Sequence, residues 1–201
     1  MAPELRLLTD TQLGRVYRER VKADFPPAER RPLASIRRLR ARGVYDTWGL
    51  FERERLLAYA FLWRSADTGC ALLDYLAVDG ALRGRGTGGR ALELLRERYA
   101  GRILLAEAEA PSPDAPPGEN ALRARRLDFY RRNGFGLLSY RTLIFGVDYA
   151  MLACPACGPE GEAGLQAAHR ALYRSEFPGP VFRRMIHIPA ERTDSSEYIG
   201  F

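Results

Sequence analysis

The sequence predicts an α/β domain, and three observations support this fold class. Predicted strands alternate with predicted helices along most of the chain. The run Cys70–Val78 is almost continuously apolar, as in a strand buried on both faces at the centre of a sheet. A glycine-rich segment, residues 83–88, joins this strand to an amphipathic helix. With 201 residues, 46% of them hydrophobic, the chain can bury a core without disulfides or metals.

Five elements are predicted before the central strand. They are the strand Glu4–Leu8, a helix from Thr9 or Asp10 to about Lys22, a helix at Leu33–Arg42, and the strands Val44–Glu52 and Leu56–Trp63. Thr9 and Asp10 both suit a helix N-cap. Prolines in the ordered loop 25–32 prevent the first helix from continuing. The charged turn 53–55 indicates that the two strands around it form a hairpin.

Five more elements are predicted after the glycine-rich segment. They are a helix at 88–99, the strand Ile103–Glu107, a helix from about Glu119 to Arg132, and the strands Phe135–Ser139 and Thr142–Tyr149. The segment 111–118 contains four prolines, which predicts a stiff surface loop. Asn133 and Gly134 suit the C-terminus of the second helix.

The composition changes beyond Ala150, so residues 1–149 are predicted to form the main domain and 150–201 an extension packed on it. The extension contains a predicted helix at 161–175, an extended piece at 181–188 and a polar tail from Ala190. Its pair Cys154-x-x-Cys157 resembles half of a zinc site, but a structural site needs four ligands. The two histidines do not have the usual spacing, so no metal is expected and the extension has no assigned role.

Charge and hydropathy exclude several classes of protein. The net charge is +6, but Lys22 is the only lysine and the arginines are spread along the chain without interleaved aromatic residues, which argues against nucleic-acid binding. No apolar run approaches the roughly 20 residues that cross a bilayer, and the N-terminus lacks a signal core. Three cysteines are too few for a secreted disulfide framework. A cytoplasmic protein with no membrane partner is expected.

The glycine-rich segment has the properties of an anion site. Glycines let the backbone approach an anion closely, and the first N–H groups of a helix carry partial positive charge. Arg83 and Arg85 add charge, so a pyrophosphate is the expected ligand. The pattern Gly84-x-Gly86-x-x-Gly89 also fits a dinucleotide site with Glu107 as a ribose ligand. Five residues between the strand and the first glycine argue against that alternative, because the dinucleotide turn is tight.

Three segments in this order resemble the GNAT superfamily of N-acetyltransferases. They are Leu73-Asp74-Tyr75-Leu76-Ala77-Val78, Arg83-Gly84-Arg85-Gly86-Thr87-Gly88 and Phe129-Tyr130-Arg131-Arg132-Asn133-Gly134-Phe135, and the resemblance covers about residues 4–149. It implies a mixed, largely antiparallel central sheet of about six to seven strands flanked by helices, with a C-terminal helix-strand addition. It also implies transfer of an acetyl group from acetyl-CoA to a primary amine by direct attack.

The resemblance implies roles for particular residues. Backbone groups of Leu76 and Val78 would contact the pantetheine arm in a gap between two strands. The phosphates would lie on the N–H groups of Arg83, Gly84, Arg85, Gly86, Thr87 and Gly88. Tyr130 would protonate the leaving thiolate, because a phenol with a pKa of about 10 suits that transfer. A tyrosine beside Phe129 could also be a core residue.

Acylation requires a neutral amine, so a base must remove a proton from the ammonium. Glu107 is the first candidate, since some family members carry a basic glutamate there. Glu109, Asp74 and an ordered water are alternatives, and each carboxylate could instead be a solvated or hydrogen-bonded group. In the loop 25–32, Glu29 could bind a cationic acceptor and Arg30 or Arg31 an anionic one.

Two other functions stay open at this point. A CoA sensor or interaction protein would keep the coenzyme site without turnover, and a nicotinamide-dependent oxidoreductase would use the loop for a dinucleotide. The acceptor of a transferase would be a small-molecule or peptide amine that the sequence does not identify. The chain could be a monomer or a homodimer.

Overall fold

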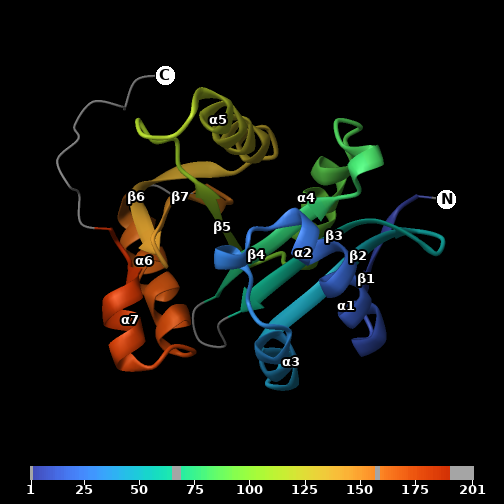
Figure 1. Ribbon diagram of the computed structural model, residues 1–201, viewed down its shortest axis with the longest axis horizontal. Coiled ribbons are helices and arrows are strands. Elements are labelled where there is room, and N and C mark those ends of the chain that lie inside the picture. Colours follow the sequence, from blue (N-terminus) through green and yellow to red (C-terminus); the bar gives the residue numbers. More distant parts are fainter. Residues whose placement is uncertain (1, 65–68, 157–158, 191–201) are drawn as a thin grey trace.

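A single eight-stranded sheet forms the centre of the molecule in a computed structural model that describes residues 2–64, 69–156 and 159–190 (Figure 1). The strand order is β1-β2-β3-β4-β5-β7-β6-β8. The strands are β1 Glu4–Leu7, β2 Tyr45–Glu52, β3 Arg55–Arg64, β4 Cys70–Val78, β5 Ile103–Glu109, β6 Gly136–Ile144, β7 Val147–Cys154 and β8 Ile186–His187. Neighbouring strands are antiparallel except β4 and β5.

The predicted mixed, largely antiparallel sheet with a C-terminal addition is confirmed, with β4 near its centre. The sheet has eight strands rather than six to seven, because β8 from the C-terminal addition pairs with the end of β6. A doubly wound dinucleotide domain needs a mostly parallel sheet. The single parallel pair therefore rules out the fold on which the oxidoreductase alternative depended.

Helical segments flank the sheet. They are α1 Asp10–Val16, a π-helical turn Tyr17–Val21, α2 Lys22–Asp24, a 3₁₀ turn Pro27–Glu29, α3 Leu33–Ala41, a 3₁₀ turn Gly80–Leu82, α4 Thr87–Arg98, α5 Pro117–Arg132, α6 Pro159–Arg174 and α7 Gly179–Met185. The first helix begins with a capping box, in which Thr9 and Gln12 exchange hydrogen bonds of 3.2 and 2.9 Å. Helix α5 begins two residues earlier than predicted because Pro117 suits the first helical turn.

The sheet is covered on both faces. One core cluster joins α1, α3, α6 and α7 to the sheet, through residues that include Leu13, Ile36, Leu172 and Phe182. A second joins α4 and α5 to the other face, with Leu95 buried at its centre. Figure 1 shows α6 and α7 at the end of the sheet that carries β6 and β7. The helix predicted at 161–175 is confirmed as α6, and the apolar stripe that its sequence indicates, Leu165, Ala168, Leu172 and Tyr173, is buried.

Two predictions of secondary structure for the last third of the chain were wrong. The two strands predicted at 135–139 and 142–149 imply a turn at 140–141, but the turn lies at Phe145–Gly146. Buried residues alternate along β6 without a break, so the strand continues through 140–141. Both residues of the observed turn have positive φ, as a two-residue hairpin turn requires. The predicted boundary at 149/150 falls inside β7, which runs to Cys154. Most of the extended piece 181–188 is the helix α7, which begins after Pro178 and buries Phe182. The polar tail beyond Ala190 lies outside the described residues, as does Cys157 of the cysteine pair.

The strands β4 and β5 pair for only half of their length. Their parallel register runs from Cys70–Ile103 to Leu73–Ala106 and then stops, although both strands continue. The register of β3 with β4 shifts at this point: Leu62 lies opposite Leu73 and Phe61 opposite Tyr75, so Asp74 is an extra residue. Such a bulge bends its strand, which accounts for the separation.

Candidate active site

A cavity of about 1340 Å³ opens where β4 and β5 separate. Small-molecule sites usually occupy roughly 300–1,000 Å³, so this one has room for more than one small ligand. At one end it is lined by the glycine-rich segment between β4 and α4. At the other end it is lined by residues of α3, α6 and the loop 25–32.

The glycine-rich segment presents free backbone N–H groups to the cavity. Gly84 and Gly86 have φ of 77° and 81°, a conformation that favours glycine, and a Cβ at either position would meet no atom within 4 Å. Thr87 begins α4, so the first turn of that helix has no intrahelical acceptor for its N–H groups. Among the described residues, no backbone carbonyl accepts from Gly84, Gly86 or Thr87. This arrangement suits an anion.

The two arginines of this segment differ in their contacts. Arg83 lines the cavity, pairs with Asp24 at 3.0 Å and donates to the Val78 carbonyl at 3.4 Å. Arg85 does not line the cavity within the described part of the chain, and its N–H already donates to Leu82 O at 3.3 Å. The glycines and Thr87 therefore line the cavity with backbone donors, whereas Arg85 lies outside its lining and has its own backbone N–H occupied.

The start of α4 packs against the end of α5. A Cβ at Gly88 would lie 3.1 Å from the Phe129 ring, and one at Gly89 would lie 2.8 Å from Asn133 Oδ1. Asn133 in turn donates to the Phe129 carbonyl at 2.7 Å. Glycine at positions 88 and 89 thus allows the close approach that brings the segment 129–133 to the cavity.

Tyr130 lies between two aromatic rings at the separated strands. Its ring centroid is 5.4 Å from that of Phe129 and 5.2 Å from that of Phe135. Burial raises the pKa of Tyr130 to about 12, although Arg126 acts in the opposite direction. The residue lines the cavity and is only partly buried, so its hydroxyl stays protonated at neutral pH and can donate a proton.

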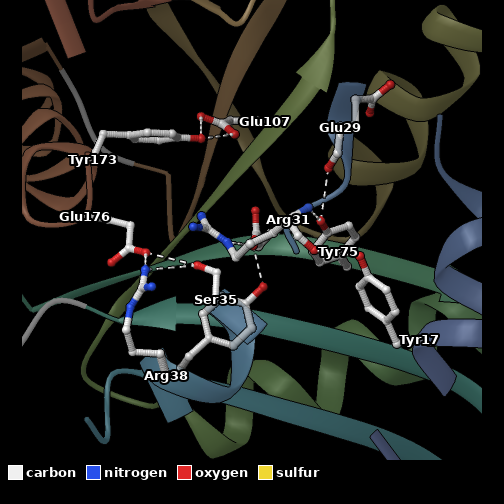
Figure 2. Close-up of polar contacts among 11 residues, drawn as sticks. Tyr17, Glu29, Arg31, Ser35, Arg38, Tyr75, Glu107, Tyr173 and Glu176 are labelled. Carbon is white, nitrogen blue, oxygen red and sulfur yellow. Dashed lines mark hydrogen bonds and ion pairs between the residues drawn. The ribbon is translucent and has the colours of Figure 1, made fainter. Parts of the chain in front are cut away.

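Glu107 on β5 lines the cavity and is held by residues of α6. Its carboxylate accepts from Tyr173 Oη, at 3.0 Å to Oε2 and 3.2 Å to Oε1 (Figure 2). Its Oε1 is also 2.9 Å from His169 Nε2. None of the arginines in the described residues forms an ion pair with Glu107.

Asp74 is already bound by its neighbours. The Arg31 Nε donates to Asp74 Oδ2 at 3.1 Å, and the Tyr45 hydroxyl donates to the same oxygen in a short hydrogen bond. Arg31 also lies over the Trp63 ring, 4.4 Å from its centroid. Burial raises the pKa of Tyr45, and the charge of Asp74 raises it further, so the Tyr45 hydroxyl keeps its proton and remains a donor. Asp74 thus anchors the loop that contains Arg31.

Two further carboxylates lie at the edge of the cavity. Glu109 on β5 forms a short ion pair with Arg123 and lies 3.8 Å from Arg126. Glu29 lines the cavity on the loop 25–32. Burial raises the pKa of Glu29, and the charge of Glu109 raises it further, while Arg126 and Arg123 lower it. A cation near Glu29 would stabilise its ionised form.

Replacing Glu29 with glutamine is expected to stabilise the fold at neutral pH. Folding raises the pKa of Glu29, so ionisation of this carboxyl lowers the free energy of unfolding. The contribution of Glu29 to that free energy is most favourable below its unfolded pKa, about 4.3. It is lost as the pH rises through the folded pKa. Glu29→Gln should therefore have a higher Tm than the wild type at pH 7 and the same Tm near pH 3.5. The exposed Glu97→Gln serves as the control, and an equal gap at both pH values would contradict the argument.

The far end of the cavity is built by residues that the sequence did not indicate. Glu176 accepts from Ser35 Oγ at 3.0 Å, forms a short ion pair with Arg38 and lies 3.4 Å from Arg42. Figure 2 shows Ser35, Arg38 and Glu176 beside Arg31, on the opposite side from Glu29. These contacts join α3 to the segment after α6.

The structure brings most of the predicted site residues to one cavity. Its lining includes Glu29, Leu76, Asp74, Val78, Arg83, Gly84, Gly86, Thr87, Gly88, Glu107, Glu109 and Tyr130. The sequence did not indicate His169 and Tyr173, which contact Glu107. Tyr173 belongs to the apolar stripe of the helix predicted at 161–175 and His169 lies beside that stripe, so their spacing indicates a buried helix face and gives no signal of contact with β5.

Comparison with solved structures identifies the fold. An acetyltransferase assigned to the GNAT family from Bacteroides thetaiotaomicron is 24% identical, with 85% of this chain and 94% of that chain covered and a TM-score of 0.65. The ribosomal-protein-S18-alanine N-acetyltransferase from Escherichia coli is 18% identical, with 79% and 97% covered and a TM-score of 0.56. An aminoglycoside 6'-N-acetyltransferase in complex with coenzyme A is 11% identical, with 78% and 99% covered and a TM-score of 0.54. The chain thus has the GNAT fold.

No family model and no curated protein sequence matches the chain. In the described part of the chain, none of the helices is long and apolar enough to cross a membrane. The same residues contain no group of three or more histidine, cysteine or acidic side chains placed to bind a metal.

Proposed function

From the GNAT fold of this chain, we propose that it transfers an acetyl group from acetyl-CoA to a primary amine by direct attack. The observation that carries the proposal is the separation of β4 and β5 directly beside Gly84, Gly86 and Thr87, whose N–H groups have no backbone acceptor in the described part of the chain. A ligand with a diphosphate at one end and a thioester at the other fits this arrangement. The glycine-rich segment would bind the diphosphate, and the gap between β4 and β5 would hold the pantetheine arm that carries the thioester. A neighbour of the same fold binds coenzyme A.

The backbone of β4 beyond Leu73 would contact the pantetheine arm. Leu76 and Val78 line the gap and have no partner on β5, since the register with β5 ends at Leu73. Val78 O already accepts from Arg83 at 3.4 Å, so Leu76 is the better placed of the two.

Glu107 is proposed as the base that takes a proton from the acceptor ammonium. Asp74 is bound by Arg31, and Glu109 by Arg123, so each is neutralised by an arginine. Glu107 is instead hydrogen-bonded to Tyr173 and His169, which leaves its negative charge available. This difference favours Glu107 over the two alternatives.

The proposed reaction moves one proton from the acceptor to Glu107 and one from Tyr130 to the leaving sulfur. The ammonium gives one proton to Glu107, and the nitrogen lone pair attacks the thioester carbonyl carbon. The carbon–sulfur bond breaks, the sulfur takes the Tyr130 proton, and the nitrogen loses its surplus proton to solvent. The proton on Glu107 then returns to Tyr130 through water. The products are the acetamide, the free thiol of CoA and one proton.

The acceptor is proposed to be a cationic small-molecule or peptide amine. Arg31, one of the two arginines suggested for an anionic acceptor, is already bound by Asp74 and is therefore less able to bind one. Glu29 lines the same cavity, and burial and Glu109 raise its pKa, so a cation beside it would be stabilising. Two neighbours of the same fold acetylate a ribosomal protein alanine and an aminoglycoside.

The test is release of the CoA thiol from acetyl-CoA in the presence of a panel of amines, with the acetylated product identified by mass. Turnover with at least one cationic amine is expected. A CoA sensor would instead bind CoA, seen as a rise in Tm, and release no thiol with any acceptor. That result would contradict the proposal.

Replacing Tyr130 with phenylalanine is expected to lower kcat about 10-fold to 100-fold without changing the affinity for CoA. This loss of kcat is small for removal of a general acid, because a thiol with a pKa near 8.5 already leaves readily without protonation. The ring stays packed between Phe129 and Phe135, so the fold is retained. Steady-state kinetics and calorimetry check the two parts, and loss of binding instead of turnover would refute the acid role.

A further inference from the structure

The geometry points to α6 as part of the catalytic site, with Tyr173 and His169 as positioning residues that orient the Glu107 carboxylate. This inference rests on the proposed function, in which Glu107 is the base. It gives a role to the C-terminal extension, which neither the sequence pattern nor the fold comparison assigns.

Tyr173 reaches Glu107 from a fixed position. Its side chain is 4% exposed, and its ring lies edge-on to Trp63 and His169, with centroids 5.3 Å from each, and stacked on Phe177 at 6.0 Å. Its hydroxyl lies within hydrogen-bond distance of both oxygens of Glu107, and Figure 2 shows it directed at the carboxylate. The ring cannot rotate away without disturbing three aromatic contacts.

His169 fixes the same carboxylate from one helical turn away on α6. It is fully buried, which is unusual for a polar side chain without a specific contact. A carboxylate only accepts, so Nε2, 2.9 Å from Glu107 Oε1, carries the hydrogen. The other nitrogen, Nδ1, lies 3.4 Å from Tyr140 Oη on β6. The imidazole thus links the sheet to Glu107.

These contacts leave Glu107 oriented but still able to accept a proton. An ionised carboxylate offers about four lone-pair positions. The Tyr173 hydroxyl can fill one and the His169 N–H a second. The remaining positions, on a side chain that lines the cavity, are free for the acceptor ammonium. Two donors from one helix hold the carboxylate plane in the orientation needed for proton transfer.

Positions 169 and 173 can be tested with variants that keep the packing. Tyr173→Phe removes only the hydroxyl. His169→Phe removes the ring nitrogens, and His169→Gln keeps an N–H group near the position of Nε2. The control is His187→Phe, at the only other histidine, which lies on β8 opposite Leu143. Glu107→Gln and the wild type are measured beside them, by thiol release with the same amine.

Tyr173→Phe and His169→Phe are each expected to lower kcat about tenfold, because each removes one hydrogen bond to a charged group. The KM for acetyl-CoA should stay within about twofold of the wild-type value. His169→Gln should recover kcat to within about threefold, and His187→Phe should be unchanged. A merely structural role would lower Tm and would show no recovery with glutamine.

Two outcomes overturn the inference in different ways. If Glu107→Gln is inactive while Tyr173→Phe and His169→Phe turn over like the wild type, or change only the KM for acetyl-CoA, the positioning role is wrong and the proposed function stands. If the wild type releases no thiol with any amine, the proposed function fails and the inference fails with it. Nitrogen NMR of the two histidines tests the contact separately, because the His169 Nε2–H signal should move in Glu107→Gln.

Discussion

Replacing Glu107 with glutamine is expected to lower kcat about 1,000-fold at pH 7, with the affinity for CoA unchanged. Glutamine keeps the size of the side chain and can still accept from the Tyr173 hydroxyl, so the packing against α6 is retained. It cannot take a proton from an ammonium. An amine with a pKa of about 10 is neutral in only about one molecule in 1,000 at pH 7, which sets the size of the loss. Steady-state kinetics with saturating acetyl-CoA measures it.

The pH dependence separates this explanation from a loss of structure. In Glu107→Gln the activity should rise about tenfold per pH unit between pH 7 and 9, because solvent then supplies the neutral amine that the carboxylate no longer makes. The comparison variant is Glu109→Gln, two residues further along β5, where the charge is already bound by Arg123. A larger loss of kcat in Glu109→Gln than in Glu107→Gln would indicate that Glu109, and not Glu107, is the base.

The sequence predicted the parts of the fold that are encoded locally. A continuous apolar run identified β4 as central, and the charged turn 53–55 identified the hairpin of β2 and β3. The glycine-rich segment was placed correctly between a strand and a helix. Each of these depends on neighbouring residues, so one sequence is sufficient to find it.

The errors occur where long-range packing decides the local structure. Phe145 has a φ of 49°, which few non-glycine residues adopt, and its N–H donates to Met185 O at 2.8 Å. Contact with α7 therefore supports a turn that propensity alone does not predict. The bulge at Asp74 is also invisible in the sequence, because it depends on which residue of β3 lies opposite.

The candidate site also contains parts that depend on neighbouring residues and could be predicted, and parts that depend on long-range packing and could not. The anion loop could be predicted because its residues are consecutive and its chemistry is that of backbone N–H groups. The partners of Glu107 could not, because 62 and 66 residues separate it from His169 and Tyr173 in the chain. Only the packing of α6 on the sheet brings them together. The packing of the loop 25–32 on β4 likewise brings Arg31, which the sequence suggested as a ligand for an anionic acceptor, to Asp74.

The anion loop provides the second large expected effect. Gly86 has a φ of 81°, and a Cβ there would meet no atom within 4 Å. Asparagine and aspartate are the residues that best tolerate this backbone conformation after glycine. Gly86→Asn and Gly86→Asp should therefore share the same strain and have similar Tm values, while only the aspartate adds a negative charge beside the proposed diphosphate.

Gly86→Asp is expected to bind CoA about 100-fold more weakly than Gly86→Asn. Two like charges roughly 4 Å apart repel by about 4 kcal/mol at the effective dielectric constant of a protein surface. Salt and movement of the side chain reduce this to about 3 kcal/mol, which corresponds to the 100-fold difference. Calorimetric titration at two salt concentrations measures it, and the difference should shrink at high salt because surface charges are screened. Equal affinities for the two variants would mean that no phosphate lies near residue 86, and the coenzyme site would then have to be sought elsewhere in the cavity.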